Sequence, residues 1–516
     1  MGKLSNFDHY KQGGYKRDRN KYSCILLEDP GDLLRPTPFY NREKELASLA
    51  RGWNYLPKGA MAMVYGRRRL GKTYLLQRLF TEPAEVETRV VYYLASQSTD
   101  EVHRREMADR VLAALPDPFA SIEELAVSWM ALLRYASRRA REIKGEARVA
   151  IVLDEFPYLV EKTPELPSIL QGWWDAEGLH SPIYAVLCGS QLSAMAALGE
   201  ETKPLYGRFN AGRHLVQPMR YDDVGRFYEG QAHYGPAEKL KMYGALGGAP
   251  RYHAMVRPDR PWDEELVDLL FRPGGQLEDE ARFLLSSEQI RDVATYQAVL
   301  GAVASGRTRR GAIANATGIG ENGLSHPLNV LQELGWVARE KPYGEKGEGR
   351  ALYRVADPFL SFHHRFVTRT ASAVQFADPM AVFKRDVEPH FADYMGRHVF
   401  ESVCAQWLWK RAATELGLMP TDLGRWWSRD GQTEIDLVAP LDGSGTLFGE
   451  CKWSANAPVD TDVLVGLQRK VVKLPEPKWL KDPRYVLFSL GGFSERLRSI
   501  ARNDPHVMLV DGSMLF

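Results

Sequence analysis

Short apolar runs alternate with amphipathic stretches through the first two fifths of the chain. The runs lie at 60–65, 90–95, 148–153 and 184–188, and apolar residues recur at helical spacing over 72–80. Continuous apolar strands separated by helices are typical of a parallel sheet that is covered on both faces. We therefore predict an α/β domain at 35–216.

The pattern changes downstream of this domain. Residues 217–285 have helical spacing, broken at 247–250, and are predicted to form a helical lid. In 286–358, helices are predicted at 296–304, 310–316 and 325–334, followed by strand-like segments at 336–340 and 351–355. This order indicates a winged helix-turn-helix. The alternative is a small helical module that only packs on the preceding domain.

The last part of the chain returns to an α/β pattern. After a helical connector at 359–390, residues 391–516 show a helix at 399–409, strand-like segments at 433–438, 447–453 and 485–490, and further helical spacing. The turn at 442–445 predicts a hairpin between the first two strands. Residues 1–34 are rich in basic and poor in apolar residues, which predicts a basic flexible tail. The expected fold class is therefore α/β and multidomain.

Composition narrows the classes of function. The chain has 516 residues, 44% hydrophobic and 26% charged, with a formal net charge of +1. Near-neutrality excludes a wholly basic nucleic-acid coat protein, and no apolar run approaches the ~18 residues of a membrane span. The four cysteines are too sparse for a disulfide framework or a zinc site. We expect a cytoplasmic protein without a signal peptide or membrane contact.

The most specific chemical signal lies between the first apolar run and the helix that follows it. Here the sequence matches GxxxxGK[ST] in full. In such a loop, glycines let backbone N–H groups converge on phosphate oxygens, and the helix N-terminus adds positive potential. Lys72 is expected to pair with the β- and γ-phosphates of ATP, and the Thr73 hydroxyl to bind Mg²⁺. The predicted nucleotide-binding residues here are Gly66, Arg67, Arg68, Arg69, Leu70, Gly71, Lys72, Thr73 and Tyr74.

Two carboxylates follow the third apolar run. Asp154 is expected to hold the metal and Glu155 to orient or deprotonate the attacking water. Ser190 follows the fourth run and is predicted to reach the γ-phosphate or the water; a helix N-cap is its alternative use. Arg208 is a candidate for stabilising transition-state charge, in cis or from a neighbouring subunit, and a surface salt bridge is the alternative.

A second cluster of candidate catalytic residues lies in the C-terminal domain. The predicted hairpin brings Asp436 beside Glu450, and period-two alternation places Lys452 on the same face as Glu450. Two carboxylates and a lysine can bind Mg²⁺ and activate water, and Glu401 can add a third carboxylate. The pattern looks like the PD-(D/E)XK nuclease core. A degenerate fold that only binds DNA or a partner is the alternative.

The winged helix supplies candidate DNA contacts from basic and polar side chains. Capping and solvation would explain several of them equally well. The predicted DNA-binding residues are Arg309, Arg310, Asn322, Ser325, His326, Asn329, Lys346 and Arg350. Farther along the chain, Trp426, Trp427 and Trp453 could stack on bases, and core packing is their alternative use.

Five segments in order resemble the archaeal-type ATPases of the STAND and AAA+-like group. They lie at 39–46, 66–73, 153–157, 247–250 and 357–360. The resemblance implies a nucleotide between core and lid, with Phe39, Asn41 and Arg42 near the adenine and ribose and Pro250 bringing the lid onto it. Many members have Gly in place of Asn41; Asn also tolerates left-handed backbone angles. Members also carry a winged helix and a nuclease-like C-terminal domain.

These signals together predict an ATP- and Mg²⁺-dependent protein that binds DNA and couples nucleotide state to a metal-dependent, endonuclease-like domain. The alternative is a nucleotide-controlled switch whose C-terminal elements only bind DNA or a protein partner. A homo-oligomer through the ATPase domain is a further expectation, and it depends on Arg208 acting in trans.

Overall fold

The computed structural model describes residues 39–54, 58–81, 87–144, 147–288, 290–347, 351–443, 445–454 and 457–516. The basic tail predicted at 1–34 therefore lies outside the described residues, as does Arg350.

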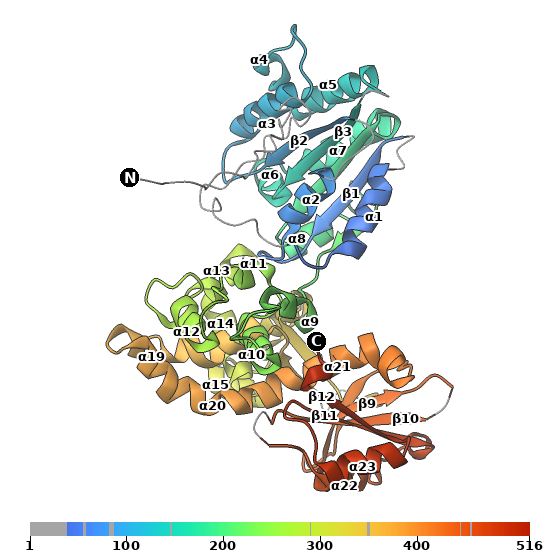
Figure 1. Cartoon of the computed structure of the whole chain (residues 1–516). Coiled ribbons are helices and arrows are strands. Elements are labelled where there is room, and N and C mark those ends of the chain that lie inside the picture. The colour runs from blue at the N-terminus through green and yellow to red at the C-terminus, as the bar shows by residue number, and fades with distance from the viewer. Residues whose placement is uncertain are drawn as a thin grey trace, which may run out of the picture.

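The first domain contains a five-stranded parallel sheet in the order β2-β3-β4-β1-β5, seen in the upper half of Figure 1. Its strands are β1 (Ala60–Tyr65), β2 (Glu87–Leu94), β3 (Ala147–Asp154), β4 (Ile183–Gly189) and β5 (Arg213–Leu215). Four of them coincide with the four apolar runs, which confirms the predicted parallel sheet. The fifth, β5, has three residues of mixed exposure and carries no recognisable pattern.

Helices cover both faces of this sheet. They are α1 (Glu43–Asn54), α2 (Lys72–Thr81), α3 (Asp100–Ala114), α4 (Ile122–Leu125), α5 (Trp129–Glu142), α6 (Phe156–Lys162), α7 (Leu166–Ala176), the 3₁₀ turn η1 (Gly178–His180) and α8 (Leu192–Ala197). Alternate residues of β1 point to opposite faces. Val64 belongs to the core that contains Leu75 of α2, whereas Met63 belongs to the core that contains Trp129 of α5.

A helical segment follows the sheet. Its elements are α9 (Tyr221–Gly225), η2 (Arg226–Tyr228), α10 (Pro236–Leu246), α11 (Pro250–Ala254), α12 (Trp262–Leu266), the π-helix η3 (Val267–Phe271) and α13 (Glu280–Ser287). α10 is followed by Gly247, whose φ of 66° is left-handed, and α11 begins at Pro250. Between them, close approach requires glycine, because a Cβ on Gly248 would lie 2.2 Å from the carbonyl oxygen of Met219.

Three helices and a two-stranded antiparallel hairpin come next, in the order predicted from the sequence. They are α14 (Val293–Ala304), α15 (Arg310–Thr317), α16 (Ser325–Glu333), β6 (Val337–Glu340) and β7 (Leu352–Val355). A run of short helical pieces then leads to the last domain: α17 (Pro358–Phe362), η4 (His363–Val367), α18 (Thr368–Thr370), η5 (Ala373–Gln375), α19 (Pro379–Val382), η6 (Phe383–Val387), α20 (Glu388–Tyr394) and η7 (Met395–Phe400).

The C-terminal domain is a second α/β unit, with its sheet in the order β12-β11-β10-β9-β8. Its strands β8, β9 and β10 pair antiparallel, and β10, β11 and β12 pair parallel. The elements are α21 (Glu401–Arg411), η8 (Ala412–Leu416), β8 (Gly424–Trp427), β9 (Glu434–Pro440), β10 (Thr446–Lys452), α22 (Thr461–Val471), η9 (Pro477–Leu480), β11 (Pro483–Ser489), α23 (Glu495–Asn503), β12 (Val507–Asp511) and η10 (Gly512–Met514).

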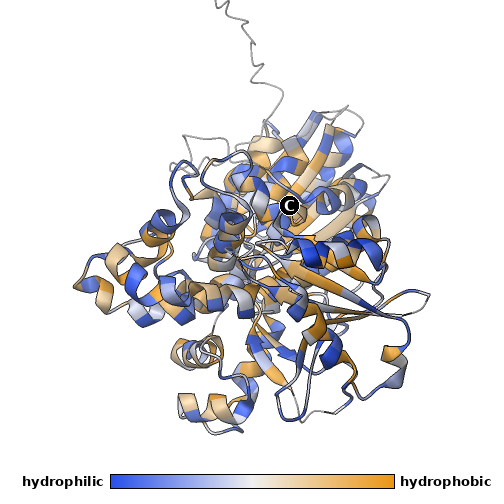
Figure 2. Cartoon of the chain, turned by 60° about the horizontal axis from the view of Figure 1, so that its bottom comes forward, coloured by the Kyte–Doolittle hydropathy of each residue, from blue (hydrophilic) through white to orange (hydrophobic). Residues whose placement is uncertain are grey.

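One buried hydrophobic cluster runs through most of the molecule. It begins at Leu49 in α1, continues through the lid helices and the α14–α17 region, and ends at Leu515. Strands of both large sheets are coloured mainly as hydrophobic in Figure 2, and polar segments lie on the outer helices. Among the described residues, no helix combines the length and apolar character that a membrane span needs.

Candidate functional site

The loop between β1 and α2 has the backbone that a phosphate-binding turn requires. Gly66 and Gly71 have φ of 156° and 81°, and Arg69 between them is also left-handed at 71°. A Cβ on Gly66 would lie 2.5 Å from the carbonyl oxygen of Val216, so only glycine fits there. Lys72 Nζ donates to the carbonyl oxygens of Gly66 at 2.8 Å and Arg67 at 3.1 Å. The ammonium group therefore lies inside the loop that carries it.

The two predicted magnesium ligands meet at the end of β3. Thr73 Oγ1 donates to Asp154 Oδ2 at 3.0 Å, and the backbone N–H of Glu155 donates to Asp154 Oδ1 at 2.9 Å. The hydroxyl of Tyr92 in β2 also donates to Asp154 Oδ2. Burial and the Asp154 charge raise the pKa of Tyr92 far above its usual range, which keeps this hydroxyl a donor. Tyr92 was not predicted, because an aromatic residue within an apolar run is typical of core packing.

Glu155 and Ser190 contact each other directly. Glu155 is held at a φ of 53°, just before α6, and Ser190 Oγ donates to its carboxylate at 2.8 and 2.9 Å. Ser190 is buried at the end of β4. The position that precedes α8 is Gln191, without a side-chain cap, so the N-cap alternative for Ser190 is not what the structure contains.

Residues predicted near the base converge beside the loop. Asn41 and Arg42 both have positive φ, 59° and 79°, as the left-handed tolerance of Asn allows. Asn41 Nδ2 donates to Asp223 Oδ2 at 2.6 Å, and Arg42 Nη2 donates to the carbonyl oxygen of Gln217 at 2.7 Å. Pro250, the first residue of α11, packs against the loop: its Cγ lies 3.7 Å from the position of a Cβ on Gly71.

Each arginine of the loop is bound to a different element. Arg67 Nη1 donates to Asp357 Oδ2 at 2.6 Å, and Arg68 Nη2 to the Tyr158 hydroxyl of α6 at 2.6 Å. Arg69 makes a two-pronged contact with Glu280 at the start of α13, at 2.9 and 3.3 Å. Of the other predicted loop residues, Leu70 is buried and Tyr74 is 40% exposed.

A carboxylate that directly follows α13 also approaches this site. Glu288 accepts from the backbone N–H of Leu192 at 3.0 Å, and burial raises its pKa to about 7 although Lys72 and Arg68 act against this shift. Nothing in the local sequence marks Glu288, because its contact with Leu192 depends on how the end of α13 packs against the first domain.

Arg208 lies in a different environment from the loop. It forms a two-pronged ion pair with Asp175 of α7, with distances of 2.9 and 2.7 Å, and also donates to two nearby backbone carbonyls. The surface salt bridge considered as the alternative is therefore present within this chain.

The C-terminal hairpin brings its predicted residues together. Leu437 pairs with Gly449 in the β9–β10 register, which places Asp436 and Glu450 at adjoining positions. Asp436 Oδ2 accepts from the backbone N–H of Cys451 at 2.8 Å. Glu450 accepts from Lys452 at 2.8 Å and, with both oxygens, from Lys470 of α22. Lys470 was not predicted, because it reaches the site from a helix some twenty residues away.

A cavity of about 370 Å³ lies between this sheet and the β6–β7 hairpin. Its lining includes Glu401, Asp436, Arg425 and, from the hairpin, Glu340 and Arg354. Arg425 pairs with Glu401 at 3.2 Å and with Glu340 at 3.4 Å. Burial raises the pKa of Glu401 to about 8 and that of Asp436 to about 6. Within the described part of the chain, no three His, Cys, Asp or Glu side chains are grouped so that they could hold a metal ion.

Most of the predicted DNA-contact residues are exposed to solvent. Those on the described part of the chain that are exposed are Arg309, Asn322, Ser325, His326, Asn329 and Lys346. Arg310 is half-buried and donates to the carbonyl oxygen of Glu321 at 3.0 Å and to the Ser325 hydroxyl. Of the tryptophans considered for base stacking, Trp426 and Trp427 are buried, as the core-packing alternative expected.

Two family models match the chain. Residues 39–256 match a family described as an ATPase domain predominantly from Archaea, and residues 363–463 match one described as archaeal and bacterial proteins of unknown function. An uncharacterized protein of Methanocaldococcus jannaschii is 28% identical over 429 residues, which cover 80% of this chain and 87% of that protein.

Three solved structures are similar to parts of this chain. The Walker-type ATPase of Pyrococcus abyssi is 20% identical, with a TM-score of 0.46 over 64% of this chain and 99% of that one. The ORC2 protein of Aeropyrum pernix, in ADPNP–ADP complexes, is 13% identical, with a TM-score of 0.44 over 68% and 97%. A STAND protein of Pyrococcus horikoshii is 14% identical, with a TM-score of 0.30 over 70% of this chain and 48% of that chain.

Proposed function

We propose that this chain, which carries an ATPase domain of a type found predominantly in Archaea, binds and hydrolyses ATP and uses its nucleotide state to control its C-terminal half. The observation that supports this most is the contact between Thr73 of the phosphate loop and Asp154 at the end of β3. It brings together the hydroxyl and carboxylate oxygens that Mg²⁺ prefers, directly beside a loop of converging N–H groups.

Different side chains would bind the phosphates, hold the metal ion and activate the attacking water. Lys72 and the loop amides would bind the β- and γ-phosphates, and Thr73 and Asp154 would hold Mg²⁺, which neutralises phosphate charge during transfer. Glu155 would orient the attacking water and accept its proton. Ser190, which donates to both oxygens of Glu155, would fix the direction of that carboxylate. The oxygen donors present fit a magnesium ion.

Binding and turnover test this proposal separately. We expect calorimetry to detect ATP binding by the wild type in Mg²⁺ and none by Lys72→Ala. Glu155→Gln should still bind ATP but hydrolyse it at least ~100-fold more slowly, in line with loss of a general base. Lys162→Ala, which removes an exposed lysine paired with Glu161 on α6, is the control and should behave as wild type. Wild-type protein that binds no ATP would refute the proposal.

The helices α14–α16 and the β6–β7 hairpin support a winged helix that binds DNA. Exposed polar side chains lie at and near the start of α16, the helix that would enter the major groove in such a module. We expect His326→Ala with Asn329→Ala to weaken binding of labelled duplex DNA in an anisotropy titration, whereas Glu238→Ala on α10 should not. Equal affinities would assign these side chains to solvation alone.

The C-terminal carboxylates carry a second candidate function, a metal-dependent nuclease. It is favoured by Asp436, Glu450 and Lys452, which lie together as a nuclease core would need. Yet the carboxylates do not fit a metal site as they lie, because Glu450 is paired with two lysines and Glu401 with Arg425. No hydrolytic step through a metal follows from this arrangement. Plasmid cleavage in Mg²⁺ by the wild type but not by Lys452→Ala would establish the nuclease, and equal behaviour would favour a module that only binds DNA or a partner.

An assembly through the ATPase domain is the remaining proposal. Arg208 could leave Asp175 to serve a neighbouring subunit's nucleotide. Light scattering with and without ATP and Mg²⁺ tests this, and an unchanged monomer would rule it out.

A further inference from the structure

A buried ion pair joins the phosphate loop to the far half of the chain. Arg67 and Asp357 are 290 residues apart in sequence, their side chains are each 5% exposed, and Nη1 and Oδ2 are 2.6 Å apart. Burial opposes ionisation of Arg67, but the charges around it, that of Asp357 foremost, together outweigh burial and raise its pKa. Because this pair is shielded from water and salt, the loss of either partner would leave an uncompensated buried charge on the other.

Arg67 has hydrogen-bonding capacity to spare. Its Nε and Nη2 atoms are buried, and no hydrogen-bond acceptor for them is found among the described residues. An unsatisfied buried donor costs about 1–3 kcal/mol, more when it belongs to a charged group. A guanidinium matches phosphate oxygens in a two-pronged geometry. Arg67, inside a phosphate-binding loop, is therefore only half satisfied by Asp357.

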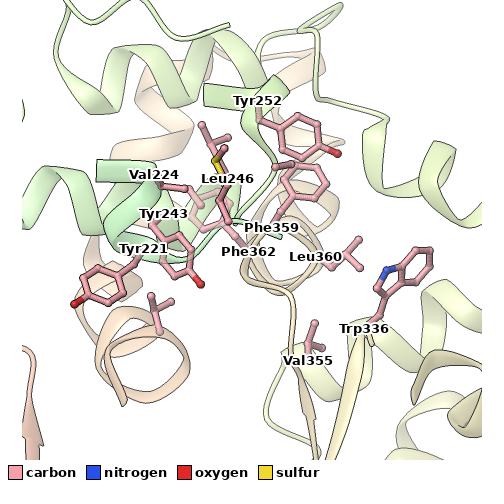
Figure 3. Close-up of a cluster of buried hydrophobic side chains, with 14 of the residues drawn as sticks. Tyr221, Val224, Tyr243, Leu246, Tyr252, Trp336, Val355, Phe359, Leu360 and Phe362 are labelled. Atoms are coloured by element: carbon pink, nitrogen blue, oxygen red, sulfur yellow. The ribbon is translucent and has the colours of Figure 1, made fainter. Parts of the chain in front are cut away.

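Asp357 connects Arg67 to the end of the hairpin. It follows β7 by two residues and caps α17, where its Oδ1 accepts from the backbone N–H of Leu360 at 2.9 Å. Phe359 and Leu360 are fully buried, and the ring of Phe359 lies 4.8 Å from that of Tyr252 in α11. Figure 3 shows Phe359 beside Tyr252, with Leu360 facing Trp336 and Val355 of the hairpin region. A change at Asp357 thus reaches both the lid and the hairpin.

Phosphate binding by Lys72 would also change the hydrogen bonds of Arg67. Lys72 Nζ donates to the carbonyl oxygens of Gly66 and Arg67, and phosphates that take this ammonium group remove those bonds. Arg69, two residues on, is paired with Glu280, which also accepts from the Tyr252 hydroxyl at 3.1 Å. Two loop arginines are therefore held by carboxylates that would compete with an anionic ligand.

We propose that nucleotide phosphate and Asp357 compete for Arg67, so that nucleotide binding releases Asp357 and loosens the junction between the hairpin and α17. This inference rests on the proposed ATP binding. Coupling of this kind is reciprocal: a carboxylate that favours the nucleotide-free loop weakens nucleotide binding, and nucleotide weakens the carboxylate's hold.

The variant Asp357→Asn isolates the ion pair from the helix cap. Asn is as good an N-cap as Asp, so α17 keeps its cap while the charge is lost. Asp378→Asn is the matched control: Asp378 also caps a helix that begins with Pro, accepts from the third following backbone N–H at 2.9 Å, and is exposed. Because the competitor is gone, Asp357→Asn should bind ATP and ADP at least ~5-fold more tightly than wild type, within the usual range of coupling. Asp378→Asn should bind as wild type does.

The wild type gives a second readout that depends on no variant. Hydrogen exchange at residues 359–362 should become faster when ATP is added, because the Leu360 amide loses a firmly placed acceptor. Asp357→Asn that binds ATP no more tightly than Asp378→Asn, or unchanged exchange in α17 of ATP-bound wild type, would overturn the competition while leaving ATP binding intact. Wild type that binds no nucleotide would overturn both proposals.

Discussion

The carboxylate of Asp154 is held by donors on both of its oxygens. Thr73 and Tyr92 donate to Oδ2, and the backbone N–H of Glu155 donates to Oδ1. Of these three, only Tyr92 comes from outside the predicted motifs. Groups that orient a metal ligand commonly matter almost as much as the ligand. Tyr92 is therefore expected to position Asp154 for Mg²⁺ without touching the nucleotide.

Replacement of Tyr92 by Phe should weaken the response to magnesium. Without the hydroxyl, Asp154 is less firmly oriented, and we expect the Mg²⁺ concentration for half-maximal ATPase activity to rise by about 10-fold. Tyr93→Phe is the control, because the neighbouring hydroxyl contacts His103 and Glu106 instead. ATPase activity of both variants is measured as a function of Mg²⁺ concentration. If the two variants need the same Mg²⁺ concentration for half-maximal activity, Tyr92 contributes to packing alone.

His253 makes lid stability depend on pH. It is buried between the Tyr228 hydroxyl and the carbonyl oxygen of Gly247, and burial lowers its pKa to about 4. The unfolded chain binds a proton on this ring near pH 6.5, whereas the folded chain does not. Stability is therefore fully present above about pH 6.5 and is lost as the pH falls towards 4.

His253→Gln should flatten this dependence. Between pH 6.5 and 4 the free energy of unfolding should vary less steeply than in wild type, by up to ~1.4 kcal/mol per pH unit, the slope for one proton. Urea unfolding at a series of pH values measures it, with His180→Gln on an exposed turn as the control. A variant with the wild-type slope would show that other groups govern acid unfolding.

At the scale of elements, the β6–β7 hairpin is attached to the C-terminal domain. The backbone N–H of Tyr343 donates to the carbonyl oxygen of Arg425 in β8 at 2.6 Å, and the Tyr343 hydroxyl donates to Asp422 at 3.1 Å. Its ring centroid lies 5.5 Å from that of Trp479. Through Glu340 and Arg354, the hairpin also lines the cavity that contains Glu401 and Asp436.

Tyr343→Ala should loosen the contact between residues 341–347 and the C-terminal domain without affecting the nucleotide site. We expect faster hydrogen exchange in β8 and in residues 341–347, together with unchanged ATP affinity. Tyr206→Phe, at an exposed turn of the first domain, is the control. Protection that is retained in the hairpin would mean that the Glu340–Arg425 ion pair holds it without Tyr343.

Local sequence patterns predicted the helices and strands, but they did not predict contacts between residues that are far apart in the sequence. The apolar runs and the phosphate-loop motif depend on neighbouring residues, so the parallel sheet and the position of Lys72 could be read from the sequence. The pairing of Arg67 with Asp357 depends on how the segment between β7 and α17 packs against the loop, and no spacing rule encodes that. The same holds for Lys470, which reaches Glu450 only because α22 packs on β10. Short strands such as β5 carry too few residues to show a period.

At the scale of the whole molecule, α9 joins the first domain to the last. Asp223 of α9 accepts from Asn41, and Asp222 pairs with Lys410 of α21. The Tyr221 hydroxyl donates to the carbonyl oxygen of Leu515 at 2.9 Å. Multidomain proteins commonly unfold in steps. Because the buried cluster of this chain is continuous across these contacts, we expect its parts to unfold together instead.

Leu515→Ala tests this cooperativity. Leu515 is 1% exposed in the shared core, so its truncation should cost about 2–5 kcal/mol of unfolding free energy. Since ATP would bind only the folded state, nucleotide at 100 times its Kd should restore about 2.7 kcal/mol if the whole chain unfolds as one unit. Calorimetric melting of wild type and variant with and without ATP measures both effects, and Leu480→Ala, at a 37% exposed position, controls for loss of a leucine. A C-terminal transition whose melting temperature does not change with ATP would show that the last domain unfolds independently. The contacts between the two domains would then couple nucleotide binding to the last domain only weakly.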